Sequence, residues 1–127
     1  MFVRNLNEAE PFRTKDGSVV RSILDKATAP VANQSLAEAR LEPGLSTTPH
    51  LHPRSEEFYL ITRGRGDMEV GGERRPVKEG DAVLIPPGTP HRITNTGEVA
   101  LTILCCCAPA YDHGDTVLLE RVPVPES

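Results

Sequence analysis

Four residues in the middle of the chain have side chains that commonly bind transition metals: His50, His52, Glu57 and His91. His50 and His52 are two positions apart, so on a β-strand both imidazoles leave the same face, with Cα atoms about 7 Å apart. Glu57 heads the next apolar stretch after a bend, and His91 follows a tight turn of sequence Pro-Pro-Gly-Thr-Pro. This order of residues allows three ring nitrogens and one carboxylate to converge on a single ion.

A His-x-His pair by itself is weak evidence for a metal, because most histidines lie on the surface or have other partners within a core. The acidic ligand is also open at this level, since Glu56 and Glu57 are adjacent. Glycines, prolines and an asparagine at fixed distances from the histidines supply further evidence. The glycines and prolines have a structural explanation of their own, because Gly accepts a positive φ and Pro presets φ in turns.

The spacing of these residues resembles the two sequence motifs of the cupin superfamily. The first motif, G-x5-H-x-H-x(3 or 4)-E-x6-G, is matched by Gly44, His50, His52, Glu57 and Gly64. The second motif, G-x5-P-x-G-x2-H-x3-N, is matched by Gly80, Pro86, Gly88, His91 and Asn95. Within the first motif, the six residues that separate Glu57 from Gly64 favour Glu57 over Glu56 as the acidic ligand.

The resemblance implies an all-β fold, the cupin double-stranded β-helix or jelly-roll barrel, in a single domain over residues 1–127. The barrel core would occupy residues 34–108, and residues 1–33 would form an N-terminal arm or strand. The resemblance also implies one divalent transition metal ion per chain, with the ligands His50, His52, Glu57 and His91. Iron, manganese, nickel, cobalt, zinc and copper all suit a ligand set without a thiolate.

Cupins include dioxygenases, decarboxylases, isomerases and lyases, but also storage proteins and sensor domains, so the fold alone names no reaction. An octahedral ion with four protein ligands keeps two positions for water or substrate, whereas a structural site is closed. We therefore expect a metal-dependent enzyme that acts on a small, oxygen-rich organic molecule. The alternative is a non-catalytic module that binds a small molecule in the same pocket. No catalytic residue beyond the metal ligands is indicated.

The rest of the chain alternates short apolar stretches with turns, which favours a barrel or sandwich of short strands. Strands are expected over residues 18–24, 34–41, 48–51, 56–62, 65–70, 73–77, 82–85, 91–94, 99–108 and 116–122. Alternation along residues 56–62 places Tyr59 and Ile61 on the same face as Glu57, and Glu56 on the opposite face. Residues 110–115 are expected to form a surface loop that can cover the barrel mouth.

The composition argues against several classes of partner. A net charge of −4 and a pI near 5.5 provide no basic surface for phosphates, so no nucleic-acid partner is expected. No apolar run approaches the ~20 residues that cross a bilayer, and the first residues lack the apolar block of a signal peptide. We therefore expect no membrane contact and a cytoplasmic protein. Solvated positions are expected for four arginines that are candidates for an anionic substrate: Arg54, Arg63, Arg65 and Arg92.

The three cysteines are consecutive, Cys105 to Cys107, and neighbours on a strand point to opposite faces. They cannot converge on one ion or form an ordinary disulfide framework, so we expect them to be reduced and structural. A homodimer is expected as well, because a lone small barrel leaves a sheet edge exposed. Residues 18–24 would pair with the sheet edge of a second chain, reached through residues 26–30.

Overall fold

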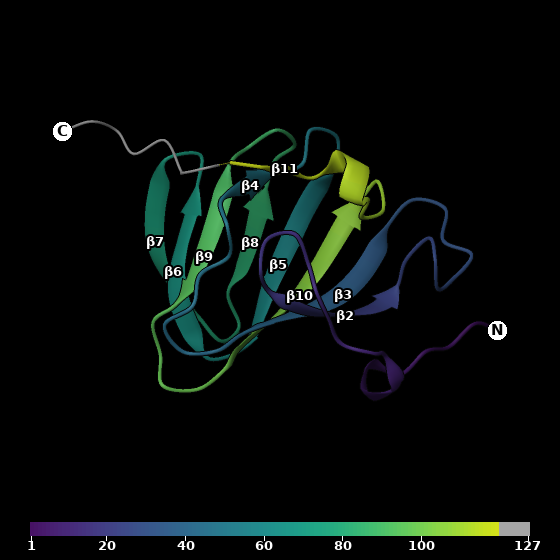
Figure 1. The fold of residues 1–127 in the computed structure, drawn as a ribbon, viewed down its shortest axis with the longest axis horizontal. Helices are drawn as coiled ribbons and strands as arrows, with labels where there is room; N and C mark the ends of the chain where they lie inside the picture. Colours follow the sequence, from purple (N-terminus) through teal and green to yellow (C-terminus); the bar gives the residue numbers. More distant parts are fainter. Residues whose placement is uncertain (120–127) are drawn as a thin grey trace.

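The computed structural model describes residues 1–119, which form short antiparallel strands joined by turns (Figure 1). The strands are β1 (Phe12–Arg13), β2 (Val19–Leu24), β3 (Ser35–Leu41), β4 (His50–Leu51), β5 (Glu56–Arg63), β6 (Arg65–Val70), β7 (Glu73–Lys78), β8 (Ala82–Ile85), β9 (His91–Asn95), β10 (Leu101–Ala108) and β11 (Val117–Leu118). Within this part of the chain, the helices are two 3-10 turns, η1 (Leu6–Glu8) and η2 (His113–Asp115). Neither has the length and apolar character that a membrane-spanning helix needs.

The strands form two sheets that enclose the core between them. One sheet has the order β1-β2-β3-β10-β5-β8, the other has the order β11-β4-β9-β6-β7, and all pairs are antiparallel. Strands that are distant in sequence are neighbours in space, since β10 lies between β3 and β5, and β9 lies between β4 and β6. This jelly-roll arrangement confirms the expected all-β fold.

β5 shows the pattern that positions the site. Its side chains alternate between the solvent and the barrel interior, so that Glu57, Tyr59 and Ile61 are buried. Phe58 and Leu60 point outward and are exposed. Side chains of a strand alternate between its two faces, so if one residue points inward, every second residue along the strand also points inward. The expectation that Glu57, Tyr59 and Ile61 share one face of this strand is confirmed.

Within the described residues, two strands begin two residues later than expected, and several others differ from the expected range by one residue at an end. The segment expected over 48–51 is a strand only at β4, since Pro49 has no N–H to donate to a ladder. β10 begins at Leu101 rather than Val99, because the carbonyl of Val99 accepts a hydrogen bond from the Asn95 side chain instead of pairing with a strand. At the C-terminal end β11 covers part of the strand expected over 116–122, and residues 120–122 lie outside the described residues.

β2 pairs with β3 of the same chain, and β1, which was not expected, pairs with β2. The expectation that residues 18–24 pair with a second chain is therefore wrong for the chain as folded here. The cause lies in the connection after β2, where the carboxylate of Asp25 accepts hydrogen bonds from the backbone N–H groups of Ala27 and Thr28. This turn folds residues 26–30 back instead of extending them.

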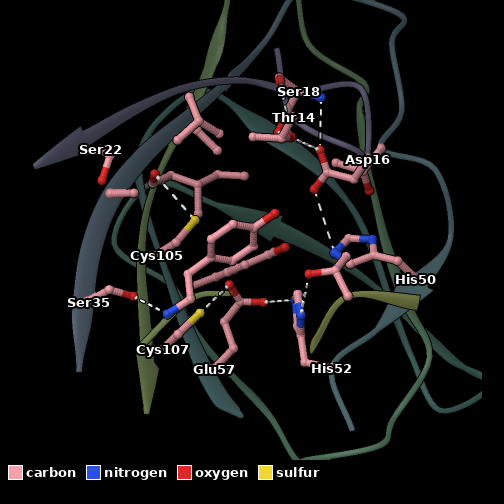
Figure 2. Close-up of a pocket in the computed structure, with 18 of the residues that line it drawn as sticks. Thr14, Asp16, Ser18, Ser22, Ser35, His50, His52, Glu57, Cys105 and Cys107 are labelled. Carbon is pink, nitrogen blue, oxygen red and sulfur yellow. Dashed lines mark hydrogen bonds and ion pairs between the residues drawn. The ribbon is translucent and has the colours of Figure 1, made fainter. Parts of the chain in front are cut away.

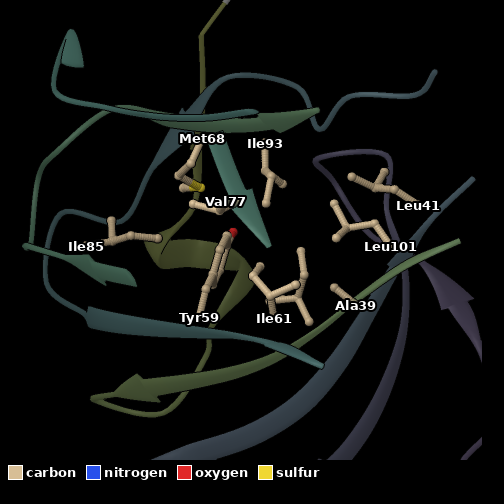
Figure 3. Close-up of a cluster of buried hydrophobic side chains, with 10 residues drawn as sticks. Ala39, Leu41, Tyr59, Ile61, Met68, Val77, Ile85, Ile93 and Leu101 are labelled. Atoms are coloured by element: carbon tan, nitrogen blue, oxygen red, sulfur yellow. The ribbon is translucent and has the colours of Figure 1, made fainter. Parts of the chain in front are cut away.

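The core lies between the sheets and is made of aliphatic side chains around Tyr59 (Figure 3). Five of its residues are at most 1% exposed: Ile61, Ile85, Ile93, Leu101 and Ile103. The side chain of Asn95 is also buried, and its amide donates to the carbonyls of Leu41 and Val99. The motif asparagine thus joins β9, the strand that carries His91, to the turn before β10 and to the end of β3.

Candidate metal centre

β4, β5 and β9 bring the four candidate ligands together inside the barrel. His50 lies directly opposite His91 in the pairing of β4 with β9, while His52 follows β4 and Glu57 projects inward from β5. One ligand atom from each residue lies within 4.8 Å of the other three. All four residues are buried, with at most 5% of their surface exposed. The four residues that the motif spacing indicated as candidate ligands therefore form one cluster.

Main-chain hydrogen bonds orient each imidazole ring. Nδ1 of His50 lies 2.7 Å from the carbonyl oxygen two residues before it, and Nδ1 of His91 makes the same kind of contact at 3.0 Å. Nδ1 of His52 lies 3.2 Å from the carbonyl oxygen of Asp115. A carbonyl oxygen only accepts, so the proton of each neutral ring sits on Nδ1 and each Nε2 keeps its lone pair. The three rings are thus prepared to bind one cation.

Two buried atoms at the centre of the cluster lack hydrogen-bond partners among residues 1–119: Oε1 of Glu57 and Nε2 of His91. They lie 3.4 Å apart, and Nε2 of His52 is also 3.4 Å from the same carboxylate oxygen. A buried polar atom without a partner is costly, and here the atoms facing one another are all acceptors. A cation between them satisfies all of them at once, so the residues present fit a metal ion.

Burial and charge set the protonation states of the ligands. Burial alone would raise the pKa of Glu57, but the neighbouring rings of His52 and His91 lower it overall, to about 2. Burial lowers the pKa of His50, and the neighbouring His91 lowers it further. Burial also acts to lower the pKa of His52, yet the contact with Glu57 raises it overall. Glu57 is therefore a carboxylate, and a cation bound here takes the place of the proton that Glu57 attracts to His52.

The structure also separates the two adjacent glutamates. Glu56 is exposed on the outer face of β5, whereas Glu57 is 5% exposed inside the barrel. The four arginines that were candidates for binding an anionic substrate do not line the cavity that adjoins these ligands, which is described below. One of them, Arg92, pairs with Glu69. Convergence on one point is thus observed for His50, His52, Glu57 and His91, and their role as metal ligands stays a prediction.

A cavity of ≈ 70 Å³ is lined by three of the four candidate ligands, His50, His52 and Glu57 (Figure 2). Its walls come from β2, β3, β5 and β10, from the loop between β1 and β2, and from the segment after β10. That last segment was expected to cover the barrel mouth, and it contributes Tyr111 and Thr116 to the wall, while His113 is exposed. The space holds about five water molecules at ~10–15 Å³ each, so only a small ligand fits inside.

Three polar residues of this wall were not identified from the sequence: Asp16, Cys107 and Tyr111. Oδ2 of Asp16 lies 3.6 Å from Nε2 of His50, and the thiol of Cys107 donates to Oε2 of Glu57 at 3.1 Å. The sequence did contain a signal for Cys107, because side-chain alternation along a strand places Cys105 and Cys107 on one face and Cys106 on the other. Asp16 lies in a loop that no motif connects to the histidines.

Comparisons with known proteins agree with this fold. The family model for the cupin domain matches residues 37–107, which is more than half of the chain. The chain belongs to the cupin family, as its two motifs predicted. It is similar to the uncharacterized protein MJ1618 of Methanocaldococcus jannaschii, with 47% identity over 114 residues that make up 90% of this chain and 91% of that protein.

Two further relatives carry named activities. The polyketide synthase CurC of Streptomyces cyaneus is 31% identical over 96 residues, which are 76% of this chain and 62% of that protein. Among solved structures, a predicted oxalate decarboxylase from Thermotoga maritima aligns with a TM-score of 0.76 and 27% identity, over 85% of this chain and 99% of that chain. The names differ in chemistry, which is what a fold shared by many reactions leads us to expect.

Proposed function

We propose that this cupin is a metal-dependent enzyme that acts on a small, oxygen-rich organic molecule. One divalent transition metal ion would be bound by His50, His52, Glu57 and His91. The observation that carries this proposal is the buried cluster itself, in which three oriented Nε2 atoms and one carboxylate oxygen face one another without any proton donor between them. A site of this kind beside a cavity supports chemistry rather than a purely structural role.

When bound, the metal would act as a Lewis acid toward a substrate oxygen, and iron would add reactivity with oxygen. The chain contributes the rest. The carbonyls that hold the three Nδ1 protons keep each ring in one orientation, and the apolar wall of Ala37, Ala39 and Leu41 excludes bulk water. The donor set contains no thiolate, so iron, manganese, nickel, cobalt, zinc and copper are the candidate ions.

The named relatives support the substrate class. One is called a polyketide synthase and another a predicted oxalate decarboxylase, and both names refer to compounds rich in oxygen. Carboxylate, enolate and hydroxyl oxygens are also the groups that bind a divalent ion in an open coordination position. We therefore place the substrate among small molecules that offer such oxygens.

Metal analysis of the protein purified from its native host tests the proposal. We expect about one transition metal ion per 13.8-kDa chain in the wild type, loss of metal in His91→Ala, and unchanged metal content in Glu56→Ala. A wild-type protein without metal contradicts the proposal. The metal-loaded protein is then incubated with small hydroxy, keto and carboxylic acids, and their consumption is followed by NMR. A compound that binds and is recovered unchanged would favour the alternative, a non-catalytic binding module.

We also propose that the chain forms a homodimer through the outer face of the larger sheet. The register across β3, β10, β5 and β8 places four apolar side chains in one row: Leu36, Cys106, Phe58 and Leu84. Phe58 and Leu84 are 51% and 56% exposed. A flat apolar face of this kind can pack against its own copy around a two-fold axis.

The cytoplasm is the compartment that we propose for this protein. All three cysteines, Cys105 to Cys107, are free. The thiol of Cys107 donates a hydrogen bond to Glu57, which requires the reduced form. Reducing compartments keep thiols in this state, whereas secreted domains of this size commonly carry disulfides.

A further inference from the structure

The cavity beside the candidate ligands has a second carboxylate with a defined orientation. Asp16 lies in the loop between β1 and β2, and its side chain is 16% exposed. Its Oδ1 accepts three hydrogen bonds, from the Thr14 hydroxyl at 2.6 Å and from the backbone N–H and hydroxyl of Ser18 at 2.9 and 2.6 Å. All of these donors are on one oxygen, so the other oxygen, Oδ2, is turned toward Nε2 of His50, 3.6 Å away (Figure 2).

No cationic side chain balances this carboxylate inside the cavity. Among residues 1–119, the lining contains neither lysine nor arginine, while it contains three acidic residues, Asp16, Asp25 and Glu57. The nearest lysine in sequence, Lys15, directs its ammonium group to the backbone carbonyls of His113 and Thr116 and does not line the cavity. A divalent ion would offset only two of these three carboxylates, so the cavity would keep a net negative charge.

This excess of negative charge distinguishes between ligands by their own charge. A neutral ligand adds no charge to the buried cavity, whereas a dianion adds two negative charges that no side chain of the lining offsets. The remaining polar groups of the wall are hydroxyls and thiols, and no hydrogen bond of the Tyr59 hydroxyl is observed within residues 1–119.

We propose that Asp16 determines the ligand specificity of this cavity, which accepts neutral carbonyl compounds that carry hydroxyl or amide donors and excludes dicarboxylates. Oδ2 of Asp16 accepts a hydrogen bond from the ligand, while its charge opposes a second carboxylate near the ion. The proposal rests on the proposed metal site. It also separates this chain from relatives whose names refer to oxalate, although the fold is shared.

The experiment is a titration of the cobalt-loaded protein with oxalate and with oxamide, which have nearly the same size and planar shape but differ by two charges. Cobalt(II) absorbs visible light, and its bands change when a ligand enters its coordination sphere. We expect Asp16→Asn to bind oxalate about tenfold more tightly than the wild type, because a nearby negative charge is removed. Oxamide should gain nothing. No gain for oxalate, or an equal gain for both probes, overturns the proposal.

A matched control uses another acid of the same cavity. Asp25 lines it as well, but its oxygens are engaged by Ser22, Ala27 and Thr28. Asp25→Asn should leave the oxalate affinity within about twofold of the wild type. An equal gain in Asp25→Asn and Asp16→Asn would show that only total charge matters, and this overturns the role of Asp16.

Two further measurements keep the test decisive. If circular dichroism shows that Asp16→Asn does not fold, Asp16→Ala removes the same charge and must give the same gain for oxalate. Cobalt uptake separates this proposal from the proposed function. If the wild type binds no cobalt, both the proposed metal site and the proposed specificity are rejected. If the wild type binds cobalt but the Asp16 variants bind oxalate with the same affinity as the wild type, only the proposed specificity is rejected.

Discussion

At the scale of single residues, the contact between Cys107 and Glu57 decides how firmly the carboxylate is held. The thiol donates to Oε2 at 3.1 Å, which leaves Oε1 directed at the histidines. Groups that hold a metal ligand in this way commonly change metal affinity by about 10–100-fold when they are removed. Cys107 thus contacts a candidate ligand, and we propose that it positions Glu57 in addition to the structural role expected for all three cysteines.

Replacement of this thiol gives the first prediction. Cys107→Ala should weaken cobalt or zinc binding about tenfold in competition with a chelator of known affinity. Cys107→Ser, which keeps a donor, should restore most of the affinity. Cys106→Ala is the control, because Cys106 lies on the opposite face of β10 and should leave the affinity unchanged. Equal losses in Cys107→Ala and Cys106→Ala would show that Glu57 is positioned without the thiol.

The reactivity of the cysteines gives a second prediction at this scale. Burial raises the pKa of Cys105 and of Cys107, and the charge of Glu57 raises both further. Alkylation requires the thiolate, which is therefore scarce at these two positions near neutral pH and becomes available only as the pH rises toward the raised pKa. Iodoacetamide at pH 8 should label Cys105 and Cys107 far more slowly in the native protein than in denaturant, as measured by peptide mass mapping. Similar rates in both conditions would contradict buried, protonated thiols.

At the scale of elements, β6 and β9 approach each other closely at a glycine. Gly66 lies opposite Asn95, and a Cβ added to Gly66 would lie 2.4 Å from the backbone oxygen of Thr94. Backbone cannot move aside as a flexible side chain can. β9 carries His91, so strain at this point also affects the site.

Gly66→Ala should accordingly lower the free energy of unfolding by about 1–3 kcal/mol in urea titration. Gly97→Ala serves as the comparison, because its added Cβ would mainly meet the side chain of Arg65, which can rotate away. We expect Gly97→Ala to change the stability by less than about 0.5 kcal/mol. Equal stability of the two variants would mean that the strands separate at Gly66 at little cost.

At the scale of the whole molecule, the exposed row on the larger sheet is the interface of the proposed homodimer. Light scattering at micromolar concentration should give twice the chain mass of 13.8 kDa. Leu84→Glu should shift the mass to that of one chain, because it places a charge in the proposed interface. Leu45→Glu should leave the dimer intact, since Leu45 is exposed beside Asn95 of the other sheet. A wild type with the mass of one chain would remove the dimer.

Several features follow from the sequence alone because local geometry dictates them. His50 and His52 share a face since strand side chains have a period of two, and the same period turns Glu57 inward and Glu56 outward. Glycines and prolines in the two motifs mark the turns, because each is selected by the backbone angles of one position. The jelly-roll fold and the set of four candidate ligands were predicted from a different source, the resemblance of the two motifs to those of cupins.

The other features depend on contacts between distant segments, and only the tertiary structure decides them. Asp16 comes to face His50 because a loop near the N-terminus folds over the cavity, and Cys107 comes to contact Glu57 because β10 pairs with β5. The pairing of β2 with its own chain follows from the turn at Asp25 in combination with a free edge of β3. Such contacts leave no periodic pattern in the sequence, since they depend on which strand edges remain available after the rest of the sheet has formed.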